Sequence, residues 1–141
     1  MTGVDRVAEA VALAGRNAQQ LRLDNVRFHE SHWFSTVGNQ RYRLIVSNPP
    51  YIPAGDPHLE QGDVRFEPGS ALIAGVDGLD DIRQIIAQAP EYLQDDGWLL
   101  LEHGYDQAAA VRELLAAGGF ADVESRRDFG GHERISLGRR P

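Results

Sequence analysis

Apolar and polar residues along this chain follow two different periods in alternation. In "VAEAVALAGRNAQQL", residues 7–21, apolar side chains recur every three or four positions, which predicts an amphipathic helix. The same spacing returns in "GLDDIRQIIAQAPEYL", residues 78–93, and in "YDQAAAVRELLAAGGF", residues 105–120. Pro90 lies within the second segment and is expected to kink or divide that helix, because proline lacks an N–H and its ring meets the preceding turn.

Two short apolar runs between these helices predict buried strands. The first is "YRLIVSN", residues 42–48, whose aliphatic run at residues 44–46 lacks alternation, as expected for a strand covered on both faces. The second is "GWLLLEH", residues 97–103, and the turn residues 95–97 are expected to open it.

Weaker strand patterns complete the alternation. They lie in "MTGVD", "NVRFHE", "ADVESRRD" and "ERISLGRR", and the last two are joined around Gly130 and Gly131. After Pro53 a polar stretch rich in glycine and proline predicts a long loop with room for a short helix. This order predicts an α/β fold with a mostly parallel sheet whose last strand is antiparallel.

Composition is that of an ordinary globular protein. The chain has 141 residues, of which 42% are hydrophobic and 25% charged, and this length suits one domain. No apolar run approaches the roughly 18 residues that span a bilayer, and no signal-peptide pattern follows Met1. The absence of cysteine excludes disulfides and thiolate zinc sites, which fits a cytosolic protein. The net charge of −7 argues against a large nucleic-acid footprint, which needs clustered Lys and Arg.

The stretch "VSNPPYIP" ends a predicted buried strand on a rigid corner, because prolines cannot donate to a sheet ladder. In such sheets, ligands bind outside the carboxyl ends of the strands. Asn48 offers both an acceptor and a donor, the Asn48 and Pro49 carbonyls accept hydrogen bonds, and the Tyr51 ring offers a flat face. We therefore expect the corner to bind a planar NH₂ group, such as a carboxamide or the exocyclic amine of a base. The alternative is a proline-rich turn with a capping Asn and a core Tyr.

The tetrapeptide "NPPY" at a strand end resembles the signature of S-adenosylmethionine-dependent methyltransferases that act on planar amide or amine nitrogens. Adenine-N6 DNA methyltransferases and several ribosomal RNA methyltransferases share it. The longer pattern is more specific. The segments "NPPYIP", "HLEQGDVRFEPGSALIAGVDGLDDI", "GWLLLEHGYDQAAAVRELL" and "RDFGGHERISLGR" resemble the HemK-type glutamine-N5 methyltransferases of peptide-chain release factors, from Val4 onward.

The resemblance implies a Rossmann-like α/β fold and an activity. The cofactor would be S-adenosyl-L-methionine, and its methyl group would go to the side-chain amide nitrogen of the glutamine in the Gly-Gly-Gln motif of a release factor. The partner would be that protein, in the cytoplasm, with no direct nucleic acid, membrane or metal. An adenine-N6 methyltransferase, or an inactive remnant that acts only as an interaction module, are the alternatives.

The resemblance also assigns a substrate site. Asn48, Pro49, Pro50 and Tyr51 match the motif that holds the substrate glutamine. The amide NH₂ would donate to the Asn48 side-chain oxygen and to the Pro49 carbonyl, which holds the nitrogen in line with the methyl group. Asn48 is also expected to contact the cofactor.

For the cofactor, Asp5 in "GVD" matches the acidic residue that takes the ribose hydroxyls, and Trp33 in "SHWF" matches a position at the adenine region. From the residues alone, the pattern favours a helix N-cap or a first-turn acid for Asp5, and a core or surface aromatic for Trp33. His32 stands where the family commonly has Asp, so the polar contact of the adenine pocket differs here.

Other polar residues carry weaker signals. Glu102 and His103 end the strand pattern at residues 97–103, where they either line the cleft or are satisfied structural groups. Glu67 in "FEP" is expected to order the loop beside the site. No metal site is expected, because the histidines lack metal-ligand spacing. They are His29, His32, His58, His103 and His132.

Parts of the family pattern are missing. The glycine-rich cofactor loop should precede Asp5 by about twenty residues, and only four residues stand there. The N-terminal domain that recognises the release factor and the first strand of the sheet, expected at its centre, are also absent. We therefore expect residues 1–141 to be a partial methyltransferase catalytic domain, the C-terminal half of a longer enzyme, and we expect this piece alone to be inactive.

Overall fold

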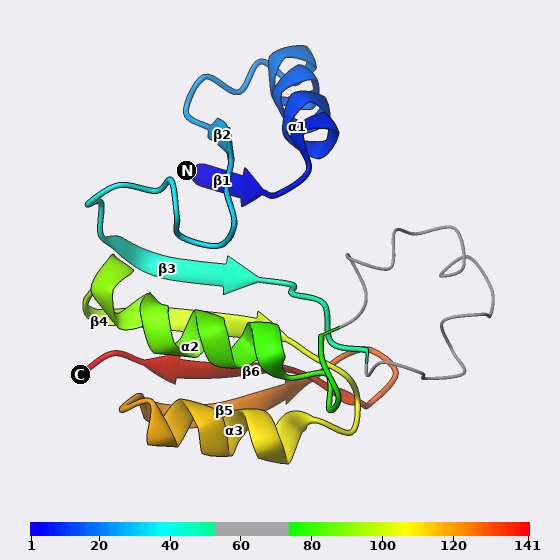
Figure 1. The fold of residues 1–141 in the computed structure, drawn as a ribbon, viewed down its shortest axis with the longest axis vertical. Coiled ribbons are helices and arrows are strands. Elements are labelled where there is room, and N and C mark those ends of the chain that lie inside the picture. Colours follow the sequence, from blue (N-terminus) through cyan, green and yellow to red (C-terminus); the bar gives the residue numbers. More distant parts are fainter. Residues whose placement is uncertain (53–73) are drawn as a thin grey trace. The chain divides into compact units, whose positions relative to one another are not determined.

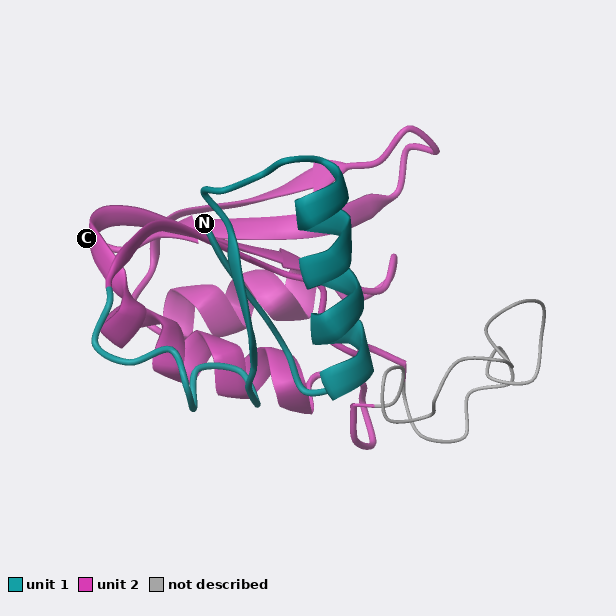
Figure 2. Ribbon diagram, turned by 90° about the horizontal axis from the view of Figure 1, so that it is seen from above, with its two compact units in different colours: residues 1–40 teal, residues 41–141 magenta. Residues whose placement is uncertain are grey.

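The computed structural model describes residues 1–52 and 74–141. These residues form two compact units, residues 1–40 and residues 41–141 (Figures 1 and 2). The predicted loop after Pro53, with Glu67 and His58, lies outside the described residues.

The first unit is one strand–helix–strand repeat. Its elements are β1 (Thr2–Asp5), α1 (Ala8–Gln20) and β2 (Arg27–Glu30), and the two strands pair in parallel. The Phe28 ring lies over Gly3, since a Cβ at Gly3 would stand 2.7 Å from it. Ala18 is the one apolar side chain of this unit that is buried. The helix and both strands predicted from the sequence are confirmed.

The second unit contains a four-stranded mixed sheet (Figure 1). β3 pairs with β4 in parallel, and β6 runs antiparallel to both of its neighbours, β4 and β5. The prediction of an antiparallel last strand is confirmed. The strands, in the order β3-β4-β6-β5, are β3 (Tyr42–Ser47), β4 (Leu93–Glu102), β6 (Glu133–Arg139) and β5 (Ala121–Arg127).

Two amphipathic helices build the core of this unit. α2 (Asp80–Tyr92) packs against β4, and α3 (Ala108–Ala117) packs against β5 and β6. Each fully buried aliphatic side chain stabilises the fold by about 1.5–3 kcal/mol. The largest of them are Ile82, Ile85, Leu93, Leu99, Leu101, Val111 and Leu115.

The prediction that β3 is covered on both faces is wrong. Leu44 and Val46 are 53% and 67% exposed, and both sit on the same face because they are two residues apart. The two helices of this unit lie on the other face, where Leu99 and Leu101 are fully buried. Among the described residues of this unit, no helix covers the face of Leu44 and Val46.

Two local predictions also need correction. Pro90 does not divide α2, because it lies in the last turn and the Leu93 N–H still donates to the Ala89 carbonyl. Residues 95–97 do not form a separate turn before the strand. They form an irregularity within β4, where the register with β3 shifts and Asp96 has a φ of 61°.

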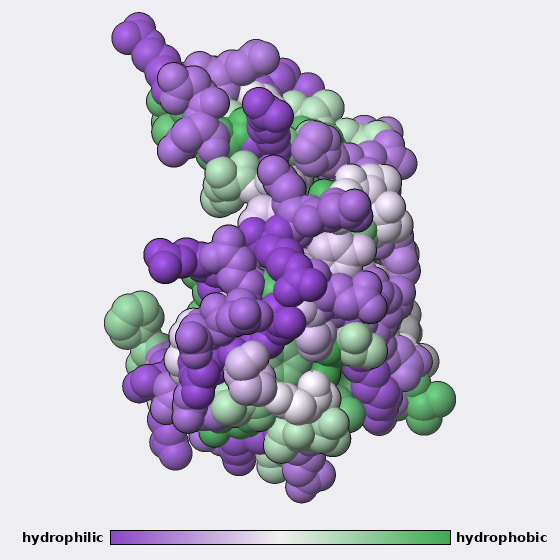
Figure 3. All heavy atoms as spheres, turned by 90° about the vertical axis from the view of Figure 1, so that its left-hand side faces the viewer, coloured by the Kyte–Doolittle hydropathy of each residue, from purple (hydrophilic) through white to green (hydrophobic). Residues whose placement is uncertain are grey.

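The edge of the sheet where β3 and β4 begin is hydrophilic over most of its surface (Figure 3). Arg139 pairs there with Asp96 and Asp122 at 2.6 Å each, and Arg140 pairs with Asp95 at 3.1 Å. These ion pairs link neighbouring strands at the end of the sheet that lies opposite the carboxyl ends of β3 and β4.

Candidate active site

The turn Asn48–Tyr51, called the site turn below, directly follows β3 at the carboxyl edge of its sheet. Pro49 is fully buried, whereas the side chain of Asn48 is exposed. Because proline fixes φ and has no N–H, the turn makes no ladder bonds at its two prolines. Pairing resumes at Ile52, whose carbonyl accepts a hydrogen bond from the Ala74 N–H at 3.1 Å. The predicted end of the strand at this corner is confirmed.

Tyr51 is held at both its backbone and its hydroxyl. The Gln107 side-chain amide donates to the Tyr51 carbonyl at 3.0 Å. The Arg134 guanidinium, on β6, donates to the Tyr51 hydroxyl oxygen at 2.8 Å and lies 5.2 Å from the ring centroid. A guanidinium donates only, so the Tyr51 O–H hydrogen stays available to another acceptor.

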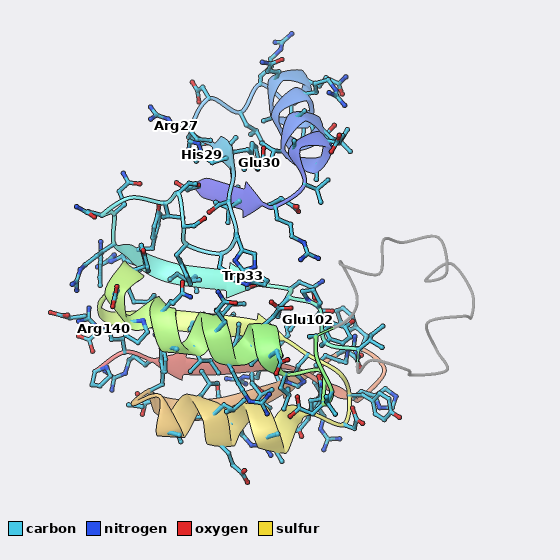
Figure 4. The ribbon with its side chains drawn as sticks, in the orientation of Figure 1. Arg27, His29, Glu30, Trp33, Glu102 and Arg140 are labelled. Carbon is cyan, nitrogen blue, oxygen red and sulfur yellow. The ribbon has the colours of Figure 1, made fainter. Side chains whose placement is uncertain are left out.

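Glu102 lies at the carboxyl end of β4 (Figure 4), with one carboxylate oxygen 3.6 Å from Arg134. Both side chains are partly exposed, and this pair therefore contributes little net stability. It orients the guanidinium that contacts Tyr51, so Glu102 belongs to the surroundings of the site turn.

His103 is fully buried and structural. Its Nδ1 lies 2.8 Å from the Gly104 carbonyl, and its Nε2 lies 2.8 Å from the Ser136 hydroxyl. A carbonyl only accepts, so Nδ1 carries the proton and Nε2 accepts from Ser136. Ser136 in turn contacts Ser125 at 2.7 Å, and Ser125 accepts from Arg112 at 2.6 Å. Burial lowers the pKa of His103, which keeps the ring neutral.

A second fixed group stands beside the site turn. Asp77 accepts hydrogen bonds from Arg83 and from the Leu79 N–H, and the bond from Arg83 is the main reason that the pKa of Asp77 is lowered to about 2. The next residue, Gly78, has a φ of 73°, and a Cβ there would stand 2.3 Å from the Tyr51 carbonyl oxygen. Only glycine fits where this turn meets the site turn.

In the first unit, Asp5 ends β1 and is exposed. Its Oδ1 accepts a hydrogen bond from the Val7 N–H at 2.8 Å, and this bond stabilises the turn that leads into α1. Its Oδ2 has no hydrogen-bond donor among the described residues. Asp5 therefore acts as a local turn residue and also presents a free carboxylate oxygen at a strand end.

The loop after β2 holds Trp33 in an unusual conformation. Ser31 donates from its N–H to the Asp5 carbonyl at 2.8 Å and from its hydroxyl to the Trp33 carbonyl at 3.0 Å. Trp33 has a φ of 51°, a left-handed conformation that costs strain for a bulky residue. Its indole Nε1 is buried without a hydrogen-bond partner in the described part of the chain. The open indole N–H and the free Asp5 oxygen fit a ligand that carries a hydroxylated ring and a flat base.

Sequence reasoning predicted the site turn, Asp5 and Trp33 as site residues but did not point to the residues that support the turn. Gln107 and Arg134 come from distant positions and follow no catalytic motif of their own. The signal that could have found Gln107 is its place in "HGYDQ", directly after the strand that neighbours β3. The two site regions, Asp5 with Trp33 and the site turn, lie in different units.

No helix among the described residues is long and apolar enough to cross a membrane. No group of three or more His, Asp or Glu side chains in the same residues is arranged to hold a metal ion.

Comparison with known proteins relates the chain to methyltransferases. The family called Methyltransferase small domain matches residues 1–62. The release factor glutamine methyltransferase of Pseudomonas aeruginosa is 70% identical over 98% of this chain and 50% of its own length. That of Escherichia coli K12 is 52% identical over 96% of this chain and 49% of its own length. The chain spans about half the length of the curated relatives it matches.

Solved structures agree on the fold. A methyltransferase from Pyrococcus furiosus superimposes with a TM-score of 0.70 and 19% identity, over 98% of this chain and 60% of the other. A ribosomal protein L11 methylase from Lactobacillus delbrueckii subsp. bulgaricus gives a TM-score of 0.67 at 17% identity, over 99% and 57%. The chain therefore has part of the Rossmann-like fold of S-adenosylmethionine-dependent methyltransferases, as the sequence predicted.

Proposed function

We propose that this chain carries the amide-binding part of a release factor glutamine methyltransferase. Its sequence matches about half of the length of such enzymes. That enzyme transfers a methyl group from S-adenosyl-L-methionine to the side-chain amide nitrogen of a glutamine in a peptide-chain release factor. One observation carries the proposal. The site turn exposes Asn48 at the carboxyl end of β3 while Pro49 is buried and Tyr51 is held by Gln107 and Arg134.

The two N–H groups of a glutamine side chain need two acceptors. The Asn48 side-chain oxygen and the Pro49 carbonyl supply them, and the prolines limit how far that carbonyl can turn. Two accepted hydrogen bonds fix the plane of the amide and favour the positive charge that develops on its nitrogen as the methyl group arrives. The methylated nitrogen must then lose one of its two protons, and because Asn48 is exposed that proton would pass to solvent water.

Tyr51 would contact the flat face of the same amide. Its ring is kept in place by Arg134, and its free O–H hydrogen can donate to an oxygen of the substrate. Because the net charge is −7 and the relatives act on a release factor, the proposed partner is a protein rather than a nucleic acid.

The residues of the first unit fit the cofactor. The free Asp5 carboxylate oxygen would accept from ribose hydroxyls, and Trp33 would lie against the adenine with its indole N–H as a donor. The bound cofactor supplies an electrophilic methyl group on a sulfonium. The chain's own part in this region is binding and orientation.

The test is a chimera in which residues 1–141 replace the matching half of the Pseudomonas aeruginosa relative. We expect it to transfer labelled methyl to a release factor, and to lose roughly 10²–10³-fold in rate on Asn48→Ala, by analogy with a deleted oxyanion-hole donor. Asn39→Ala, at an exposed asparagine of the first unit, is the matched control and should keep the rate. Full activity of the Asn48→Ala chimera, or none in the unsubstituted chimera beside an active relative, would contradict the proposal.

A further inference from the structure

Gln107 is a buried glutamine, 8% exposed, whose side-chain amide joins three separate segments. It lies directly before α3. Its Oε1 accepts the Gly104 N–H at 2.8 Å, and its Nε2 donates to the Tyr51 carbonyl at 3.0 Å and to the Asp77 carbonyl at 3.2 Å. Both hydrogens of the NH₂ group are therefore in use. The segments are the site turn, the turn before α2 and the turn after β4.

The site turn needs a support of this kind. Its two prolines have no N–H, so a neighbouring strand cannot hold this part of the backbone by a ladder. The hydrogen bond from Ala74 reaches only Ile52, beyond the turn. Within the described residues, Gln107 is the side chain that bonds the backbone of the site turn.

The space around this contact is built for it. A Cβ at Gly78 would stand 2.3 Å from the Tyr51 carbonyl oxygen and 2.7 Å from the Gln107 Nε2, so any side chain there would push the two apart. Gly78 has a φ of 73°, which also favours glycine. Gly78, the Tyr51 carbonyl and the Gln107 amide can approach this closely only because residue 78 is a glycine and has no side chain.

The two other ends of the contact are themselves fixed. Asp77 is held by Arg83 and by the Leu79 N–H. Gly104 is held through its carbonyl by the buried His103 ring. Gln107 therefore links the site turn to two segments that are held by other hydrogen bonds, at Asp77 and at Gly104. Because those segments are held, a shift of the Gln107 amide would move the Tyr51 carbonyl rather than Asp77 or Gly104.

We propose that Gln107 is a positioning residue for the site turn. Its NH₂ group sets where the Tyr51 carbonyl lies, and so sets the direction in which the Asn48 side-chain oxygen and the Pro49 carbonyl meet the substrate amide. This inference rests on the proposed function of the site turn, but the contact itself can be tested without any activity.

The first experiment tests the contact on residues 1–141 by NMR. Carbonyl ¹³C shifts report hydrogen bonds that a carbonyl accepts. Gln107→Glu keeps the volume and an acceptor for Gly104 but removes both donors. We expect it to shift the Tyr51 and Asp77 carbonyl signals, whereas Gln88→Glu, at a partly exposed glutamine of α2, should leave both in place. Unchanged Tyr51 and Asp77 signals in Gln107→Glu would overturn the proposal.

The second experiment measures kinetics in the chimera described above. We expect Gln107→Glu to lower kcat about 10- to 100-fold, as for a small misplacement of a reacting group, with the KM for S-adenosyl-L-methionine unchanged. Gln107→Met, which adds no charge, should lower kcat in the same way. A role in folding alone would lower the amount of folded enzyme and leave kcat per folded molecule intact.

The outcomes separate the two proposals. If the carbonyl signals shift but the unsubstituted chimera is inactive, the proposed function fails, and the positioning role falls with it while the contact stands. If the chimera is active and both Gln107 variants keep kcat within about twofold, well below the misplacement effect, Gln107 does not position the site.

Discussion

The two units of this chain are built from the same kinds of element, yet they differ sharply in what they bury. α1 and α2 each have 13 residues and an apolar stripe at helical spacing. α2 buries Ile82, Ile85, Ile86 and Ala89, whereas α1 buries Ala18 alone. The comparison teaches that an amphipathic pattern is enough to predict a helix, and that burial requires a second layer against which the stripe can pack.

The open apolar surface of the first unit is visible next to β1. A hollow of about 150 Å³ lies there, lined mainly by apolar side chains and Gly3, with Val11 and Ala14 of α1 on one side and Phe28 of β2 among the others. In the second unit Leu44 and Val46 are open in the same way, but the opposite face of that sheet is packed. The second unit should therefore carry most of the stability of the chain.

Cutting the chain between the units is the largest test of this comparison. Residues 41–141 alone should unfold cooperatively, with a free energy of unfolding within about 5–15 kcal/mol, as for a small domain. Residues 1–40 alone should not fold, because a two-stranded sheet with one helix buries too little apolar surface. Circular dichroism during denaturant titration of each piece gives the measurement. Strong amide protection in β1 and β2 of the isolated residues 1–40 would break the comparison.

A smaller effect comes from the glycine at the site turn. Gly78→Ala introduces a Cβ 2.3 Å from the Tyr51 carbonyl oxygen, whereas Gly119→Ala meets nothing within 4 Å. Both positions have positive φ, at 73° and 85°, so both variants bear the same kind of backbone strain, about 1–3 kcal/mol. We expect Gly78→Ala to cost a further 1–3 kcal/mol from overpacking. The midpoints of urea unfolding provide the measurement, and equal midpoints would contradict the close packing of this turn.

The buried His103 should make the second unit sensitive to pH. Its folded-state pKa is lowered by burial, so the unfolded chain binds a proton that the folded chain does not. Stability is therefore full above the unfolded value of about 6.5 and falls as the pH drops below it, by at most about 1.4 kcal/mol per pH unit.

Hydrogen exchange between pH 5 and 8 tests this expectation, after correction for the intrinsic exchange rates. Protection in β4 and α3 should decrease below pH 6.5, and His103→Gln should remove this part of the pH dependence. The expectation concerns the second unit only, so amides of β1 and β2 serve as the internal reference. A decrease that survives in His103→Gln would assign it to other groups.

Asp5 offers the smallest and most local test, since it serves a turn and presents a free oxygen. Asp5→Ala removes the acceptor for the Val7 N–H and should destabilise the start of α1 by about 1 kcal/mol. Asp5→Asn keeps that acceptor but removes the charge. In the chimera both variants should weaken cofactor binding, by about tenfold for the loss of a charged hydrogen bond. Calorimetric affinities for the cofactor that do not change in Asp5→Asn would leave Asp5 with the turn role alone.

Sequence reasoning predicted the elements better than their surroundings. The helix at residues 105–120 and the strand at residues 42–48 were both expected where α3 and β3 lie. The exposure of one face of β3 was not predicted. Three aliphatic residues in a row indicate that a strand can be buried on both faces, but they do not show whether another element is present to cover each face. Pro90 illustrates the same limit, since its cost depends on its distance from the helix end.

By itself, the sequence determined the local corner at Asn48–Tyr51, because proline geometry and the end of an apolar run are properties of neighbouring residues. It also carries the resemblance to methyltransferases, since the motifs that resemble theirs follow one another in order along the chain. Only the tertiary structure decided what holds that corner. Gln107 and Arg134 reach Tyr51 across 56 and 83 residues of chain. Such contacts depend on how β3, β4 and β6 pair and pack. Pairing between residues so far apart in the sequence produces no periodic residue pattern from which it could be predicted.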